Sequence, residues 1–302
     1  MSIPRDHHFI PAFALAPWAT NDNQLVEYTI KYQKLIPKPV GPKGTGFERD
    51  LYAFPELQPE HSQYLESVFF NYADDKAARA LDLHLNNKPG WNGELTSAWS
   101  RFVIGIHLRH PDVMLELRAA AGSIWDQSGA AYQAHYESLR RPGDPDTMDQ
   151  WLATRDPLTR AKMQLNCIIT MLDNQIVGTH LNQMKWSVLD VSNSPFRFLM
   201  SDRPVEIRQL KEPSGFISIP ISPTKLFVAA NEQQPIQRVG KLPPFDIVQH
   251  VNLWVASRAR RFVWASDESQ TGFIGEHMSV AMEPTPFFPN LDKYDPSTAT
   301  IV

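Results

Sequence analysis

Two adjacent histidines, His7 and His8, open the stretch HHFIP near the start of this 302-residue chain. Imidazole changes its charge near neutral pH, so a histidine can act as a general acid, a general base or a metal ligand. Neighbouring side chains of an extended chain point to opposite sides. We therefore expect one histidine to face inward and the other to bond locally or meet solvent. A metal ion held by both is disfavoured.

Arg109 ends a segment whose apolar residues follow helical spacing. The face consists of Leu95, Trp99, Phe102 and Ile106, at intervals of four and three residues, and Arg109 continues it. A guanidinium on such a face must be paired or must extend to water. Arg109 can therefore satisfy the last carbonyls of its helix, or it can clamp an anion and stabilise developing negative charge.

Four more polar residues border apolar segments or interrupt one. Ser201 and Asp202 follow the apolar stretch FRFLM. Ser222 ends FISIPIS, and Asn252 lies on an otherwise apolar helical stripe. Asp202 is either a turn residue or a base or metal ligand, and the serines are turn residues or substrate contacts. A buried Asn252 needs partners for its donor and its acceptor, which favours a structural role. No G-x-S-x-G elbow surrounds the serines, so a serine nucleophile is disfavoured.

Motifs that would name a cofactor are absent from the sequence. There is no P-loop, no G-x-G-x-x-G, no H-E-x-x-H and no EF-hand loop, so the cofactor and any metal stay unknown. The single cysteine, Cys167, excludes an internal disulfide and a cysteine-based zinc cage. It lies in the apolar stretch CIITML, which favours an inert core residue.

The overall charge gives no global field for binding nucleic acid. Apolar residues make up 42% and charged residues 21%, as in ordinary soluble proteins, and the net charge is -4. The distribution is uneven, because residues 48–82 carry a net charge of -5 and residues 197–261 one of +5. This asymmetry permits an anionic small molecule or a nucleic acid as partner, although the two segments could simply attract each other. The oligomeric state is not indicated.

The apolar stretch at residues 9–19 resembles the core of a signal peptide only superficially. It contains Pro11 and Pro17, and the charges of Arg5 and Asp6 before it cancel, so we interpret it as part of the folded protein. No apolar stretch approaches the ~20 residues that cross a bilayer. We expect a soluble, cytoplasmic protein that does not enter a membrane.

The elements that must position these residues change in kind along the chain. Alternation and prolines predict a β-hairpin from residues 24–30 and 34–40. Helical spacing and capping signals predict helices over 60–86, 94–109, 111–140, 148–154, 156–184 and 245–260. Strands are predicted over 186–191, 196–200, 205–209, 216–222, 225–230 and 261–266.

These elements predict an α+β fold with a central helical block and a mainly antiparallel sheet from the C-terminal half, joined by the N-terminal hairpin. We expect one domain over residues 1–266, helical over about 56–184 and β-rich over about 185–266. Residues 267–302 would form a proline-rich extension, whose last part, from residue 284, lies along the surface.

Several short motifs together resemble the bacterial domain-of-unknown-function family 4238 (DUF4238). They are HHFIP from His7, FERDLY from Phe47, Arg109-His110-Pro111, SDRPV from Ser201, IPISP from Ile219 and the helix with Asn252. The resemblance covers roughly residues 6–266. The chain departs at Ala14, where an aromatic is common, and at Trp18, where phenylalanine is common; both changes concern packing. The resemblance implies no activity, but it implies one constellation of His7, His8, Arg109, Asp202 and Asn252.

Two hypotheses follow for the function. The first is a hydrolase acting on a phosphate-containing or nucleic-acid substrate. In it, His7 or His8 is the acid or base, Asp202 orients it or binds metal, and Arg109 stabilises negative charge. The substrate contacts would be Asn252, Ser201 and Ser222. The alternative is a non-catalytic binding or interaction module, for example in bacterial defence or regulation, whose polar landmarks form a structural network.

Overall fold

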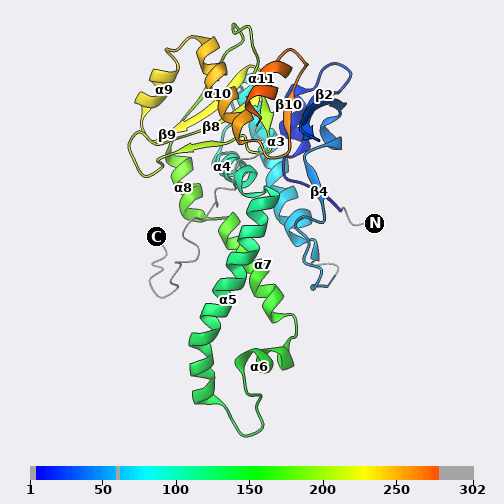
Figure 1. Cartoon of the computed structure of the whole chain (residues 1–302). Helices are drawn as coiled ribbons and strands as arrows, with labels where there is room; N and C mark the ends of the chain where they lie inside the picture. Colours follow the sequence, from blue (N-terminus) through cyan, green and yellow to red (C-terminus); the bar gives the residue numbers. More distant parts are fainter. Residues whose placement is uncertain (1–4, 59–61, 279–302) are drawn as a thin grey trace.

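The described part of the chain combines a β-rich body with a helical arm. The computed structural model describes residues 5–58 and 62–278, and Figure 1 shows the arm extending away from the sheets. Helices and antiparallel strands are both abundant, and the N-terminal hairpin is present, so the α+β class is confirmed. No helix in these residues is long and apolar enough to cross a membrane.

Three antiparallel sheets lie within the described residues. A two-stranded sheet pairs β1 (Asp6–His8) with β4 (Phe47–Arg49). The first four-stranded sheet has the order β3-β2-β10-β6, with β2 at Leu25–Lys31, β3 at Lys34–Val40, β6 at Met200–Ser201 and β10 at Val263–Ala265. The second has the order β5-β9-β8-β7, with β5 at Lys185–Asp190, β7 at Glu206–Arg208, β8 at Phe216–Ser222 and β9 at Lys225–Ala230. In the sheet β3-β2-β10-β6, a strand from the N-terminal part of the chain, β2, therefore pairs with β10 from the C-terminal part.

The helices divide between the body and the arm. Near the N-terminus lie α1 (Ala12–Leu15) and two 3₁₀ turns, η1 (Ala16–Trp18) and η2 (Pro42–Gly44). A π-helical segment, η3 (Leu65–Phe70), runs into α3 (Asn71–Asn86), which packs on α4 (Gly93–Leu108). The body also contains α8 (Gln175–Gln183), α9 (Gln233–Val239), α10 (Pro244–Arg258) and α11 (Thr271–His277).

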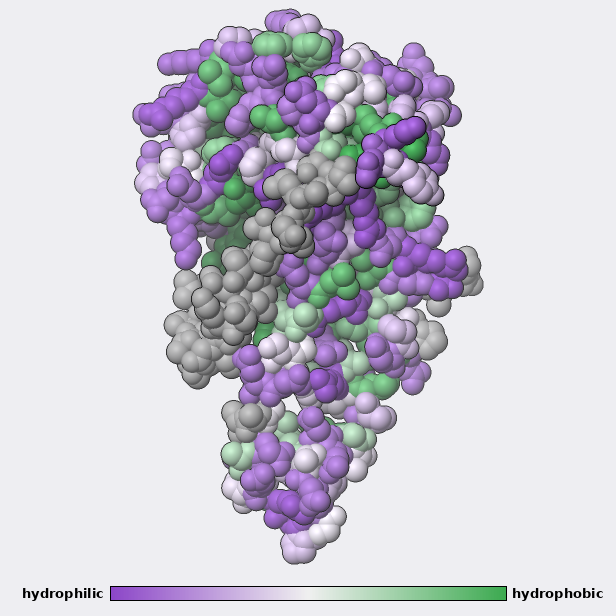
Figure 2. Space-filling view, viewed as in Figure 1, coloured by the Kyte–Doolittle hydropathy of each residue, from purple (hydrophilic) through white to green (hydrophobic). Residues whose placement is uncertain are grey.

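The arm consists of α5 (Pro111–Leu139), α6 (Met148–Arg155) and α7 (Thr159–Leu172). The first turns of α5 pack in the body, with Val113, Met114 and Leu117 buried, and its far end extends beyond it (Figure 1). The surface of the far end is mainly hydrophilic in the view of Figure 2. The root of α5, rather than its tip, is therefore the part that contributes to the body.

The sheet β5-β9-β8-β7 separates two apolar cores. Residues of β8 and β9 alternate between its faces: Ile217 and Phe227 pack with Trp99 of α4, whereas Leu226 packs with Val251 of α10. This alternation follows from the two-residue period of a strand. A third core fills the root of the arm.

The structure corrects several predicted elements. The single helix predicted over 156–184 is wrong: α7 ends at Leu172 and α8 begins at Gln175, because the Asn174 side chain caps α8 by accepting from the N–H groups of Ile176 and Val177 at 3.0 and 3.1 Å. Of the strand predicted over 196–200, only its end at Met200 is in β6. The elements β1, β4, α9 and α11 were not predicted. The proline-rich stretch from residue 284 lies outside the described residues.

Candidate functional site

His7 braces the N-terminal strand against the chain that follows β4. Its side chain is fully buried, and Nδ1 accepts a hydrogen bond from the backbone N–H of Tyr52 at 2.9 Å. The ring also stacks on the Tyr52 ring, with centroids 5.4 Å apart and planes 9° apart. His7 is therefore the histidine of the pair that anchors the backbone.

His8 points to the other side of β1, as expected for adjacent residues of a strand. Its ring is half-buried and packs against Phe47 of the paired strand, with centroids 5.4 Å apart. Burial lowers the pKa of the His8 imidazole, opposed by a hydrogen bond to the backbone of Lys43 and by the charge of Asp6. The neutral form of His8 is therefore favoured.

Arg109 forms a buried ion pair. It is the C-terminal cap of α4, is 1% exposed, and donates from Nη1 and Nη2 to the two carboxylate oxygens of Asp74 at 2.9 and 2.7 Å. Its guanidinium also lies 4.2 Å from the centre of the Phe70 ring. Burial lowers the pKa of Arg109, but Asp74 outweighs this and holds the pKa above its usual value. The guanidinium is therefore occupied by a carboxylate from α3, an arrangement not foreseen from the sequence.

Glu66 belongs to the same cluster and comes from the π-helical segment η3. Its side chain is buried, and burial raises the pKa of the carboxyl to about 7, with Arg109 opposing and Asp74 adding to the rise. Tyr52 connects this cluster to the histidines, because its hydroxyl donates to the carbonyls of Arg109 at 3.1 Å and of His8 at 3.3 Å. These contacts form one network, defined here as the buried network of His7, Tyr52, Glu66, Asp74 and Arg109.

Asp202 holds the loop that leads into β10. Its carboxylate accepts the backbone N–H groups of Arg260 at 2.9 Å, Arg261 at 2.6 Å and Phe262 at 3.3 Å. His110 lies close, with Nε2 3.6 Å from Oδ2 of Asp202, while its Nδ1 accepts the N–H of Asp112 and caps α5. Asp202 therefore serves as a backbone brace in this structure.

Asn252 and the two serines also bond to backbone. The Asn252 side chain, 2% exposed, accepts from the N–H of Leu199 at 2.9 Å and donates to the carbonyl of Arg197 at 2.8 Å. The hydroxyls of Ser201 and Ser222 each accept an N–H two residues later, from Arg203 and Thr224, both at 3.2 Å. Each of these bonds holds a turn or a strand end in place, as expected if Asn252, Ser201 and Ser222 have structural roles.

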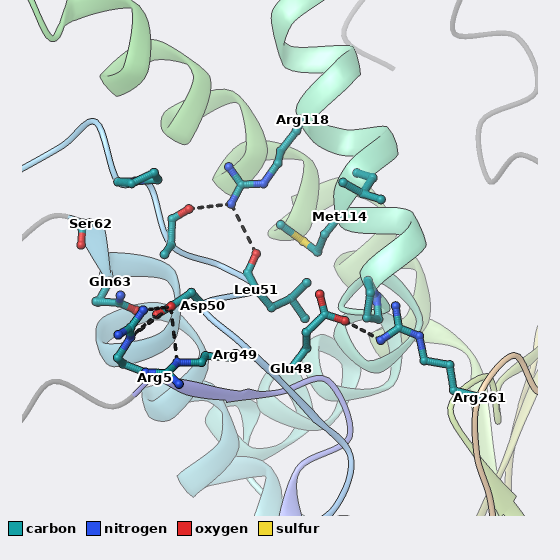
Figure 3. A pocket seen from close by; sticks show the side chains of 14 residues that line it. Arg5, Glu48, Arg49, Asp50, Leu51, Ser62, Gln63, Met114, Arg118 and Arg261 are labelled. Atoms are coloured by element: carbon teal, nitrogen blue, oxygen red, sulfur yellow. Dashed lines mark hydrogen bonds and ion pairs between the residues drawn. The ribbon is translucent and has the colours of Figure 1, made fainter. Parts of the chain in front are cut away.

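A cleft of about 680 Å³ lies between the FERDLY segment and the root of α5 (Figure 3). One wall is a face of α5 with helical spacing, formed by Pro111, Met114, Leu115 and Arg118. The other includes residues 48–51, 53 and 55, with Arg5, Ser62, Gln63 and Arg261 around it. This volume is typical of sites for small organic ligands.

Arginines dominate the charge of the cleft. Two ion pairs lie at opposite sides of Figure 3, Arg5 with Asp50 and Arg261 with Glu48. Asp50, which accepts from Nε of Arg5 at 3.0 Å, has a left-handed backbone with φ of 56°. With Arg49 and Arg118, four arginines face two carboxylates, a formal charge of +2.

Arg118 differs from the other three arginines of the cleft. One nitrogen, Nη2, donates to the carbonyls of Ala53 at 2.9 Å and Leu51 at 3.4 Å, and the guanidinium stacks on Phe54. Within residues 5–58 and 62–278, no carboxylate lies within 4.0 Å of it. Burial lowers the pKa of Arg118, opposed by Glu56. Arg118 is thus a partly buried cation with unfilled hydrogen-bonding capacity.

Gln63 adds an unfilled acceptor to the same cleft. The side chain is 9% exposed, and its Oε1 has no hydrogen-bond partner within the described residues. Buried polar atoms are usually bonded, so an unbonded one in a cavity wall is unusual. The cleft therefore presents a cation to its interior, while the unbonded acceptor of Gln63 lies buried in its wall.

Comparison with family models gives a match over residues 6–269 to a protein of unknown function, DUF4238. This match covers most of the 302 residues. The chain belongs to this family. Comparisons with curated proteins and with solved structures gave no match.

The DUF4238 landmarks lie around the cleft more than inside it. FERDLY supplies Glu48 to Leu51 and Pro111 follows Arg109 and His110, while Asp202 fixes the backbone of Arg261. His7, Arg109 and Asp202 do not line it. The FERDLY landmark therefore lines the cleft directly, whereas His7, Arg109 and Asp202 hold the structure behind its walls.

No group of three or more histidine, cysteine or carboxylate side chains suited to a metal ion occurs in the part of the chain that the structure describes. Cys167 is half-buried, and burial raises the pKa of its thiol, as in an unreactive cysteine.

Sequence reasoning missed Glu66 and Arg118, although a usable signal existed for each. Glu66, Phe70, Ala73 and Ala77 follow the same 4-3-4 spacing that singled out Arg109. Arg118 comes seven residues after Pro111 and four after Met114, on one face of α5. Applying the test for charged residues on apolar faces to every helix would have found both.

Proposed function

We propose that this DUF4238 chain is a binding module whose cleft takes an anionic, nucleotide-sized ligand with a phosphate group. The observation that carries the proposal is the Arg118 guanidinium, which faces a cleft of formal charge +2 and has no carboxylate partner among residues 5–58 and 62–278. Arginine suits phosphate because its planar set of N–H donors matches the phosphate oxygens.

The remaining walls fit the rest of such a ligand. Leu51, Met114 and Leu115 offer apolar surface against which a planar base can pack. A planar base and a phosphate on one molecule would use both the apolar surface and the Arg118 guanidinium.

Binding has more support than hydrolysis, since three of the four residues proposed for catalysis, His7, Arg109 and Asp202, are engaged elsewhere. Nδ1 of His7 accepts a backbone N–H, Asp74 occupies Arg109, and the carboxylate of Asp202 accepts three backbone N–H groups. A general base needs a free lone pair directed at its substrate. The hydrolase hypothesis therefore ranks second. For the surroundings we propose a bacterial cytoplasm, where the lone Cys167 stays reduced.

Adenosine 5′-monophosphate tests the proposal, with adenosine as its neutral counterpart. We expect isothermal titration calorimetry to show saturable binding of the monophosphate, at least about tenfold tighter than adenosine. Arg118→Met should weaken monophosphate binding by about tenfold or more and leave adenosine unchanged.

Two further variants separate binding from folding. Arg49→Met removes an exposed cleft arginine that only approaches Asp50 at 4.0 Å, so it should weaken binding without affecting the fold. Arg160→Met, on α7 and outside the cleft, is the matched control and should bind normally. The proposal fails if the monophosphate does not bind the wild-type protein, or if both cleft variants bind it as well as the control does.

A further inference from the structure

A second cavity, separate from the arginine cleft, is mainly apolar. It has a volume of about 510 Å³ and lies between the face of β7, β8 and β9 and the helices α9 and α10. Its apolar walls include Phe216, Leu226, Val228, Val239, Leu242 and Ile247. It shares no lining residue with the arginine cleft.

A carboxylate lies in the floor of this cavity. Glu206 of β7 is 3% exposed and pairs in register with Ser218 of β8, which pairs with Val228 of β9. These three residues form a row on the face that α9 and α10 cover, and Glu206 and Ser218 interrupt an otherwise apolar surface. Placing a carboxylate there is costly unless it is paired and hydrogen-bonded, so its partners are informative.

The two oxygens of Glu206 are unequally occupied. Oε1 accepts from Nε of Arg208 at 2.9 Å and lies 3.8 Å from Nε2 of His250, and both of those side chains are at least half exposed. Oε2 receives the hydroxyl of Ser218 at 3.4 Å, a long hydrogen bond. A carboxylate can accept about four hydrogen bonds, so Oε2 has room for a further donor.

These features select the chemistry of an occupant. Its body must be apolar to match the walls, and its head must donate hydrogen bonds to a carboxylate. An anionic head would meet Glu206 in a region of low dielectric, where like charges repel strongly. A cationic head gains a charge-assisted hydrogen bond instead.

We propose that this cavity binds small amphiphilic amines, with the ammonium group on Oε2 of Glu206 and the apolar body between the sheet and α10. The remaining charged groups of the lining, Glu232 and Arg238, are exposed and lie at its rim. The site is independent of the arginine cleft and of the function proposed for it.

Three six-carbon probes with different head groups test this site. Hexylamine, hexan-1-ol and hexanoate share their apolar chain and differ in charge. Ligand-observed NMR titration of the full chain should show the amine binding at least about tenfold tighter than the alcohol, with hexanoate weaker still. Equal binding of the amine and the alcohol would overturn the proposal, and so would the absence of saturable amine binding.

Variants locate the binding and keep the test independent of folding. Glu206→Gln should remove the preference for the amine over the alcohol while the alcohol binds as before. Leu242→Trp fills the cavity from its rim and should abolish binding of both, whereas Leu253→Trp, exposed on α10 outside the lining, should change neither. A Leu242→Trp protein that binds hexylamine normally would place the binding elsewhere and refute the site.

Discussion

Arg109 and Arg118 lie on consecutive helices of one chain, yet their surroundings differ sharply. Arg109 is buried in the network of His7, Tyr52, Glu66 and Asp74, and a carboxylate pairs with it through two hydrogen bonds. Arg118 faces the cleft with backbone carbonyls as its acceptors and no nearby carboxylate among the described residues. A buried guanidinium held by a carboxylate supports the fold, whereas one held only by backbone carbonyls beside open space is suited to binding a ligand.

The largest effect that this comparison predicts is on stability. Arg109→Met should lower the free energy of unfolding by about 3 kcal/mol, because it leaves the largely buried carboxylate of Asp74 without its partner. Urea denaturation measures this loss. The control is Arg101→Met, whose ion pair with Asp173 is largely exposed and should contribute less than about 1 kcal/mol.

A double variant separates the loss of the pair from the loss of packing. Arg109→Met combined with Asp74→Leu should recover much of the stability, because no unpaired charge remains. Equal stabilities of the Arg109→Met and Arg101→Met proteins would contradict the assignment of Arg109 to a structural ion pair.

Glu66 gives the buried network a pH dependence. Its pKa is about 7 in the folded protein against an ordinary 4.5, so the folded state binds the proton more tightly than the unfolded state. The stability that this proton supplies is fully present below about pH 4.5 and is lost as the pH rises to about 7. Glu66→Gln should therefore stabilise the protein at about pH 8, by up to about 3 kcal/mol, and scarcely at about pH 4.

Denaturation curves of the two proteins across this pH range provide the measurement. The exposed Glu137→Gln variant should show no such difference from the wild type. If Glu66→Gln and the wild type differ equally at every pH, burial does not shift the Glu66 proton equilibrium.

The smallest effect concerns salt. Raising ionic strength from about 0.05 M to about 0.5 M screens solvent-accessible charges far more than buried ones. Binding of adenosine monophosphate in the cleft should weaken by about tenfold, whereas the stability difference between wild type and Arg109→Met should barely change. Titrations and denaturation at both salt concentrations test this, and a salt-insensitive affinity would show that the arginines of the cleft do not bind the phosphate.

Much of the fold could be read from local patterns. Alternation placed the hairpin of β2 and β3 and the strands β8 and β9 within a residue or so, and apolar spacing placed α4, α5 and α10. Short elements escaped because three residues carry too little pattern: β1 and β4 exist because they pair with each other across about forty residues. The break between α7 and α8 was missed because the capping signal of Asn174 was not weighed against the apolar spacing around it.

The candidate site was predicted less well than the fold, and the reason is physical. Apolar neighbours along the chain singled out Arg109, Asp202 and Asn252, and all three are buried. Their partners come from elsewhere: Asp74 from another helix, backbone N–H groups at 260–262, and the backbone of Leu199. A sequence pattern indicates that a polar group needs partners but does not supply the partners' identity.

The sequence by itself determined the α+β class, the family, most long elements and some of the buried polar residues, such as Asn252, because these depend on periodicity and composition over neighbouring residues. Only the tertiary structure decided which charges are paired and which face open space. That choice depends on contacts such as Glu48 with Arg261, which join segments of opposite charge far apart in the chain. Arg109 therefore became part of the structural network, while Arg118, which the sequence did not single out, became the cation of the cleft.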